Sequence, residues 1–176
     1  MRRAGCLLLA LVATAATPRV PRSTMQSIER SLDQRIQRFS IEDPIELLGT
    51  TRGVYLERYG AVFTAEVNLV VTAVTPFRPQ LTAEEKEKLR QKKLSRLPQI
   101  KQIMRDILVH SGASLKTVPD TEQIVVGMHF FNAPWEITTG LPSQLLMQAP
   151  RKTLSDYEAG RIQKAALEAG ILEQVF

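Results

Sequence analysis

Residues 52–74 contain the most regular alternation of hydrophobic and polar residues in this sequence. After a short run and a turn at 58–60, every odd position from Ala61 to Ala73 is apolar, while even positions carry polar groups such as Glu66. A period of two over that length indicates a β-strand with one buried face and one partly wetted face. We therefore expect a β-hairpin here, with a short first strand and a long second one.

Two further stretches show the same period of two. Residues 123–131 place four large apolar side chains on one face and His129 on the other. Residues 144–149 also alternate, and their composition would suit a helix as well as a strand. Because Pro142 and Pro150 bracket a segment too short for a stable helix, we interpret it as a strand. It would return antiparallel to the preceding strand and form a second hairpin.

A spacing of three and four residues between apolar positions predicts an N-terminal helix. Ser23 or Thr24 can cap it, and its apolar stripe continues to Phe39. We expect this helix to pack on the sheet. A membrane-surface helix is the alternative, but the mixed charges on its polar face argue against that role.

A long central helix is predicted after the first hairpin. Thr82 and Glu85 have the spacing of a capping box, and Gly112 is the expected end. Pro98 lies inside the pattern, where it removes one backbone donor. We therefore expect either a kink at this proline or a second helix start capped by Ser95.

A short C-terminal helix is predicted from a second capping box, Ser155 and Glu158, to about Ala169, with Gly160 as a weak point. Together these elements predict a single α+β domain over residues 23–176. Its antiparallel sheet would have about four strands, from two hairpins. The N-terminal helix, the long central helix and the short C-terminal helix would cover one face.

The first residues have the pattern of a secretory signal peptide. Two arginines precede an apolar run at residues 5–12 and small residues at 13–16. We expect residues 1–16 to be removed on export to the periplasm or beyond, leaving a flexible leader at 17–22. The apolar run is shorter than the roughly 20 residues of a membrane span, so none would remain after cleavage. An uncleaved N-terminal anchor is the alternative.

The composition of the chain suits a single domain and excludes thiol chemistry from the mature protein. The chain has 176 residues, 44% of them apolar, which suits one globular domain. Cys6 is the only cysteine and would leave with the signal peptide. A cysteine-free mature chain excludes disulfides, a cysteine nucleophile and thiolate metal ligands.

Catalytic motifs are absent from the sequence. Gly-x-Ser-x-Gly, His-Glu-x-x-His and the glycine-rich phosphate loops do not occur, and we expect no metal site and no cofactor. Glu66 and His129 are the candidate catalytic residues, because a carboxylate and an imidazole could act as acid and base. The simpler interpretation of Glu66 is a carboxylate on the wetted face of the sheet.

A basic run on the central helix is the clearest candidate binding feature. It could meet an anionic lipid or polysaccharide, although a solvated helix face is the simpler interpretation. Nucleic acid is not expected, because the chain is predicted to be exported and no aromatic residues interleave the charges. Trp135, with neighbouring phenylalanines, could line a ligand pocket. The cations of the run are Lys88, Arg90, Lys92, Lys93, Arg96 and Lys101.

The sequence thus predicts an exported, non-enzymatic binding protein or envelope-associated interaction protein. Its partner would be an anionic envelope component or another protein, and a strand at a sheet edge could also pair with a second copy. The alternative is a hydrolase that uses carboxylates brought together around the central sheet. We lean toward a protein without enzymatic activity.

Overall fold

The computed structural model describes residues 20–40, 42–72 and 81–176. The predicted signal peptide and Ala73 at the end of the long alternating stretch lie outside these residues. Among the described residues no helix is long and apolar enough to cross a membrane. The elements are α1 (Arg22–Gln37), β1 (Glu46–Leu47), β2 (Arg52–Leu56), β3 (Gly60–Asn68), α2 (Ala83–Ser114), β4 (Gln123–Phe130), β5 (Gln144–Pro150), α3 (Arg151–Glu158), α4 (Lys164–Gly170) and β6 (Leu172–Val175).

The fold is α+β, as predicted, with a mixed sheet in the order β1-β3-β4-β5-β6. Strand β2 also pairs with β3, so β1 and β2 follow one another along the same side of that strand. Both predicted hairpins are confirmed: β2 pairs antiparallel with β3, and β4 pairs antiparallel with β5. Two short strands, β1 and β6, were not predicted, because neither is long enough to show a period of two.

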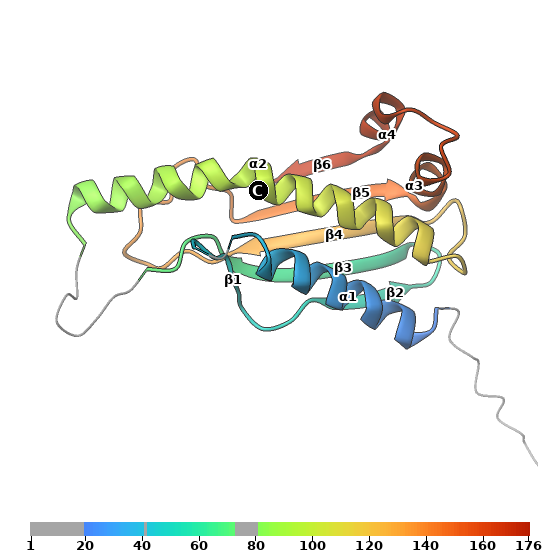
Figure 1. Cartoon of the computed structure of the whole chain (residues 1–176), viewed down its shortest axis with the longest axis horizontal. Coiled ribbons are helices and arrows are strands. Elements are labelled where there is room, and N and C mark those ends of the chain that lie inside the picture. Colours follow the sequence, from blue (N-terminus) through green and yellow to red (C-terminus); the bar gives the residue numbers. More distant parts are fainter. Residues whose placement is uncertain (1–19, 41, 73–80) are drawn as a thin grey trace, which may run out of the picture.

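The prediction of a fully antiparallel sheet is wrong at one pair, because β3 and β4 are parallel. Helix α2 connects these strands and runs back along the sheet (Figure 1). The chain therefore enters β4 at the same end of the sheet at which it entered β3, and neighbouring strands joined by such a crossover are parallel. The two hairpins meet through this parallel pair.

The alternation in β3 correctly marks its buried face. Phe63 and Val67 are fully buried, while Glu66 is exposed. The strand ends at Asn68, earlier than the alternating pattern suggested, and the exposed Val71 lies beyond it.

The helix starts differ in part from the prediction. Helix α1 begins at Arg22, one or two residues before the expected caps, with Pro21 at its N-cap and no side-chain cap. Pro21 has an extended conformation (φ −59°, ψ 135°), as a residue that lies just outside the helix should have, and it has no N–H that would need a partner. The capping box of Thr82 and Glu85 on α2 is confirmed.

Helix α2 is continuous through Pro98, so the expected second start at Ser95 does not occur, and the helix ends at Ser114, two residues beyond the expected Gly112. The Ser95 hydroxyl instead donates to the carbonyl of Lys92 within the helix. Pro98 is exposed, so water can reach the carbonyl that lacks its N–H partner. The missing hydrogen bond therefore costs too little to divide the helix.

The C-terminal helix of the prediction is two helices, α3 and α4. Gly160 lies between them with φ +71°, the left-handed conformation that favours glycine. The prediction of a second capping box was wrong. Ser155 lies inside α3, where its hydroxyl donates to the carbonyl of Lys152.

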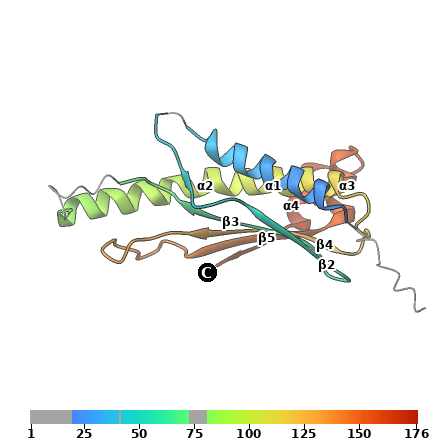
Figure 2. The same cartoon turned by 90° about the horizontal axis from the view of Figure 1, so that it is seen from below.

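The helices cover one face of the sheet and leave the other face open (Figure 2). Phe63 from the sheet, Ile28 from α1 and Met104 from α2 all lie in the core between the two layers. We call the uncovered side the open face. The sheet is thus protected from water on one side only.

Close packing of α2 against α3 gives a stability prediction. A Cβ added to Gly112 would lie 2.3 Å from Leu154 Cβ, so the two helices would have to separate. Gly112→Ala should therefore lower the free energy of unfolding by about 1–3 kcal/mol, measured by urea denaturation. Gly127→Ala is the control, because its new methyl group would meet Thr64 at an ordinary 3.6 Å. Equal effects of both substitutions would contradict the packing argument.

Candidate binding groove along the central helix

The basic run of α2 is paired with carboxylates in the structure. Two of its members, Lys93 and Arg96, are almost fully buried. The remaining four are held at the surface by ion pairs. The proposed contact of this run with an anionic partner stays a prediction. In the structure these cations pair with carboxylates of the same chain. The pairs are Lys88 with Glu84, Arg90 with Glu87, Lys92 and Arg96 with Asp43, Lys93 with Glu136, and Lys101 with Glu173.

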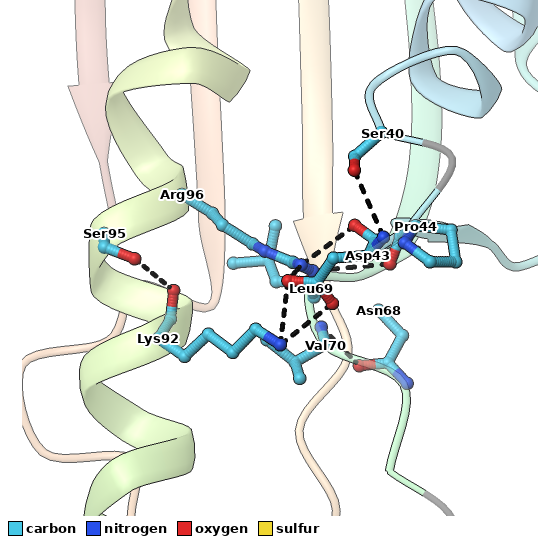
Figure 3. A network of polar contacts seen from close by, with 9 residues as sticks. All are labelled: Ser40, Asp43, Pro44, Asn68, Leu69, Val70, Lys92, Ser95 and Arg96. Atoms are coloured by element: carbon cyan, nitrogen blue, oxygen red, sulfur yellow. Dashed lines mark hydrogen bonds and ion pairs between the residues drawn. The ribbon is translucent and has the colours of Figure 1, made fainter.

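Arg96 joins three parts of the chain (Figure 3). Its guanidinium donates to the carbonyls of Asp43 (2.9 Å), Pro44 (3.3 Å) and Leu69, and it also pairs with the Asp43 carboxylate. It lies 5.6 Å from the centre of the Phe39 ring, within cation–π range. One side chain of α2 thus fixes both the segment after α1 and the end of β3.

Lys92 completes this network from the surface. Its ammonium group donates to Asp43 Oδ1 at 2.8 Å. This hydrogen bond, and after it the one from Arg96, holds the pKa of the Asp43 carboxyl below its ordinary value. Asp43 therefore carries its charge at every pH near neutrality.

Lys93 anchors the loop between β4 and β5 from the same helix. Its ammonium group donates to the Phe131 carbonyl (3.1 Å), to Asn132 Oδ1 (2.9 Å) and to the carboxylate of Glu136. Three acceptors match the three protons of an ammonium group. Arg90 adds a hydrogen bond of 2.9 Å to the Thr139 carbonyl. The loop is therefore held by cations of α2.

A groove runs along the outer side of α2. Three neighbouring hollows form it, with volumes of 530, 420 and 470 Å³, each within the usual size range of ligand sites. The first two share Arg35 and Gln102 as lining residues, and the last two share Phe39 and Gln99. The groove therefore continues from the Asp43 network to the C-terminal helices.

The middle hollow, which we call the arginine pocket, differs from its neighbours because no acidic residue lines it. Arg38 is exposed and has no side-chain partner among the described residues. Among the described residues Arg35 has one ionic partner, Asp106, at 3.6 Å, longer than a hydrogen bond. The unpaired guanidinium group of Arg38 and the weakly paired one of Arg35 thus line the same hollow as two carboxamides and two apolar side chains. The lining residues are Arg35, Arg38, Phe39, Gln99, Gln102 and Ile103.

The full chain carries a formal net charge of +5 at pH 7. The arginine pocket adds a local concentration of positive charge to this basic protein, because no acidic residue lines it. An anion would therefore be attracted both by the protein as a whole and by the pocket.

The candidate catalytic residues lie on the opposite side of the molecule. Glu66 and His129 are neighbours in the register of β3 and β4, and both are exposed on the open face. His129 Nε2 lies 3.4 Å from Gln144 Nε2 on β5. The structure thus brings the carboxylate and the imidazole into one row, but neither lines the groove.

Trp135 is half-buried against the core in the loop that Lys93 anchors. It does not line the groove, and Phe131 beside this loop is 42% exposed. The described residues contain no group of three or more histidine, cysteine or acidic side chains placed to hold a metal ion.

The arginine pocket was not found in the sequence. Arg35 and Arg38 are spaced by three, so they share a side of α1, and Phe39 follows directly. That spacing was a usable signal. It was hidden because Gln99 and Gln102 come from another helix more than 60 residues further along the chain, and only the fold brings them together.

Comparisons with protein-family models, with curated proteins and with solved structures find no match to this chain. The fold and the groove therefore define it only by class, as an α+β protein with a mixed sheet, one open sheet face and a basic pocket on its helical side.

Removing Lys93 should destabilise the protein strongly, because Glu136 would stay buried without a partner. We expect Lys93→Met to lower the free energy of unfolding by about 3–5 kcal/mol, measured by urea denaturation. Lys93→Met with Glu136→Leu should recover part of this loss, since no charge remains buried. Lys88→Met is the control: its pair with Glu84 is exposed and should contribute less than about 1 kcal/mol. A small loss for Lys93→Met would contradict this role.

The Asp43 network gives a pH prediction. A carboxylate whose pKa is lowered by folding stabilises the fold above its ordinary pKa of about 4, and this contribution is lost as the pH falls through the lowered value. The wild type should therefore exceed Asp43→Asn in stability at pH 7, by less than about 1 kcal/mol for this partly exposed group. The difference should shrink below about pH 4.

Thermal unfolding of both proteins across this pH range provides the measurement. Glu42→Gln serves as the matched control, because Glu42 is exposed and makes no ion pair with another described residue. A constant difference between wild type and Asp43→Asn at all pH values would show that the Asp43 charge is not involved.

Proposed function

We propose that this chain is an exported, non-enzymatic binding domain whose arginine pocket holds a small anionic amphiphile. The observation that carries the proposal is that Arg38, without a side-chain partner among the described residues, and the weakly paired Arg35 line one hollow with the apolar side chains of Phe39 and Ile103. Export is supported by the N-terminal sequence pattern.

The chemistry of the pocket defines the ligand class. Guanidinium groups bind carboxylates and phosphates through paired hydrogen bonds, and the carboxamides of Gln99 and Gln102 can add further donors. The apolar floor favours a ligand whose charged head continues into a hydrocarbon chain. Such molecules occur as lipids and fatty acids, which an exported protein would meet at the cell envelope.

A set of small probes tests this function. Decanoate and decyl phosphate carry the head and the chain together, whereas decanol lacks the charge and acetate lacks the chain. We expect isothermal titration calorimetry on the full chain to detect the first two, and to find the last two at least about tenfold weaker. The tighter of the first two identifies the preferred head group.

Matched variants locate the site. Arg38→Gln should weaken decanoate binding about tenfold or more, because a hydrogen bond to a charged group contributes about 1.5–3 kcal/mol. Arg30→Gln, on the same helix but outside the pocket, should leave the affinity unchanged. Absence of binding by both amphiphiles, or equal effects of the two variants, would refute the proposed function.

A hydrolase is the second candidate function, favoured by the row of Glu66, His129 and Gln144 on the open face. A carboxylate beside an imidazole can orient it as a general base. The position is exposed, so a substrate would have to supply its own shielding from water. Loss of a hydrolytic activity on Glu66→Gln, with binding of decanoate unchanged, would favour this candidate.

A further inference from the structure

The open face of the sheet carries exposed apolar side chains. Val54 and Leu56 on β2 are 51% and 46% exposed, and Leu172 on β6 is 50% exposed. The residues between Val54 and Leu172 in the register are Val62, Val125 and Gln148, and Leu146 lies in the next row of β5. Apolar residues thus occur on strands from β2 to β6, with Gln148 as a polar interruption. A surface of this kind usually marks an interface.

Few charges interrupt this face. Glu46 accepts a hydrogen bond from Asn68 at 3.3 Å. Arg52 and Glu66 have no side-chain hydrogen bond or ion pair with any other residue that the structure describes. Arg52 pairs in register with Thr64, and Glu66 lies two residues further along β3. One free cation and one free anion therefore lie near each other on the same face.

We infer that a second copy of the chain docks on the open face, sheet against sheet. A two-fold axis that lies between the copies and midway between these two residues places Arg52 of each copy opposite Glu66 of the other. The dimer then contains two equivalent ion pairs between the copies, as the self-complementarity of a two-fold interface requires.

The size of the face agrees with such a dimer. Strands about 4.8 Å apart, with a rise of about 3.3 Å per residue, make this sheet roughly 20 Å by 30 Å. That area, on the order of 600 Å² in projection, is comparable to the ~800 Å² per partner that stable interfaces bury.

Pairing between copies at the β2 edge is blocked, which favours docking through the face. Glu29 of α1 accepts the Gly53 N–H at 2.7 Å, and Arg22 donates to the Gly53 carbonyl at 3.1 Å. Asp33 accepts the Thr51 N–H at 2.9 Å. Side chains of α1 thus occupy backbone groups that a further strand would need.

Substitutions that reverse the charge of Arg52 or Glu66 test the dimer and its symmetry. We expect sedimentation equilibrium to show a dimer for the full chain. Arg52→Glu and Glu66→Arg should each weaken it about tenfold or more, because like charges would then face each other. Mixing these two variants should restore a dimer of one copy of each, since every contact again joins opposite charges.

Three results would overturn the inference: a monomeric wild type, two variants that dimerise as well as the wild type, or a mixture that stays monomeric. Arg30→Glu on α1 makes the same charge change on the helical side and should leave the dimer intact. Thermal unfolding of each variant separates loss of dimer from loss of fold. The arginine pocket lies on the other side of the sheet, so either proposal can fail alone.

Discussion

Two buried cations of α2 hold the irregular parts of this chain in place. Lys93 and Arg96 are nearly inaccessible to water, and their partners are mainly backbone carbonyls and single carboxylates from segments outside the helix. A buried charge without partners is costly, so the loop after β4 and the segment after α1 are tied to their observed positions. The segment held by Arg96 also forms one end of the groove, because Ser40 and Asp43 line its hollow there.

The basic residues of the helical side therefore have two different roles: some pair with groups of the fold, and others can bind a ligand. The cations of the central run have partners within the fold, whereas Arg35 on α1 and Arg38 at its C-cap line a hollow without acidic residues. The helical side therefore offers a local site for an anion. The sheet side offers an apolar face with Arg52 and Glu66, whose side chains have no partner among the described residues. Two distinct surfaces result from covering a sheet on one side only.

The sequence predicted the elements that bury a long, regular face. The alternation around Phe63 and the spacing in α1 are local patterns, since each residue reports its own burial. The capping box of Thr82 is local as well. By contrast, β6 is too short to show a period of two. The effect of Pro98 on the central helix was overestimated, because the sequence does not show that this proline is exposed to water. Lys93 appeared to be a surface residue, since the acceptors that allow its burial lie about 40 residues away.

By itself, the sequence determined the fold class, the two hairpins and the buried face of each long strand, because hydrophobic periodicity is a property of neighbouring residues. It also singled out Glu66 and His129. Only the tertiary structure decided that β3 and β4 are parallel, that those two residues are neighbours, and that Arg38 meets Gln99 across two helices. These relations join residues far apart in the chain, and the packing of α2 across the sheet fixes them.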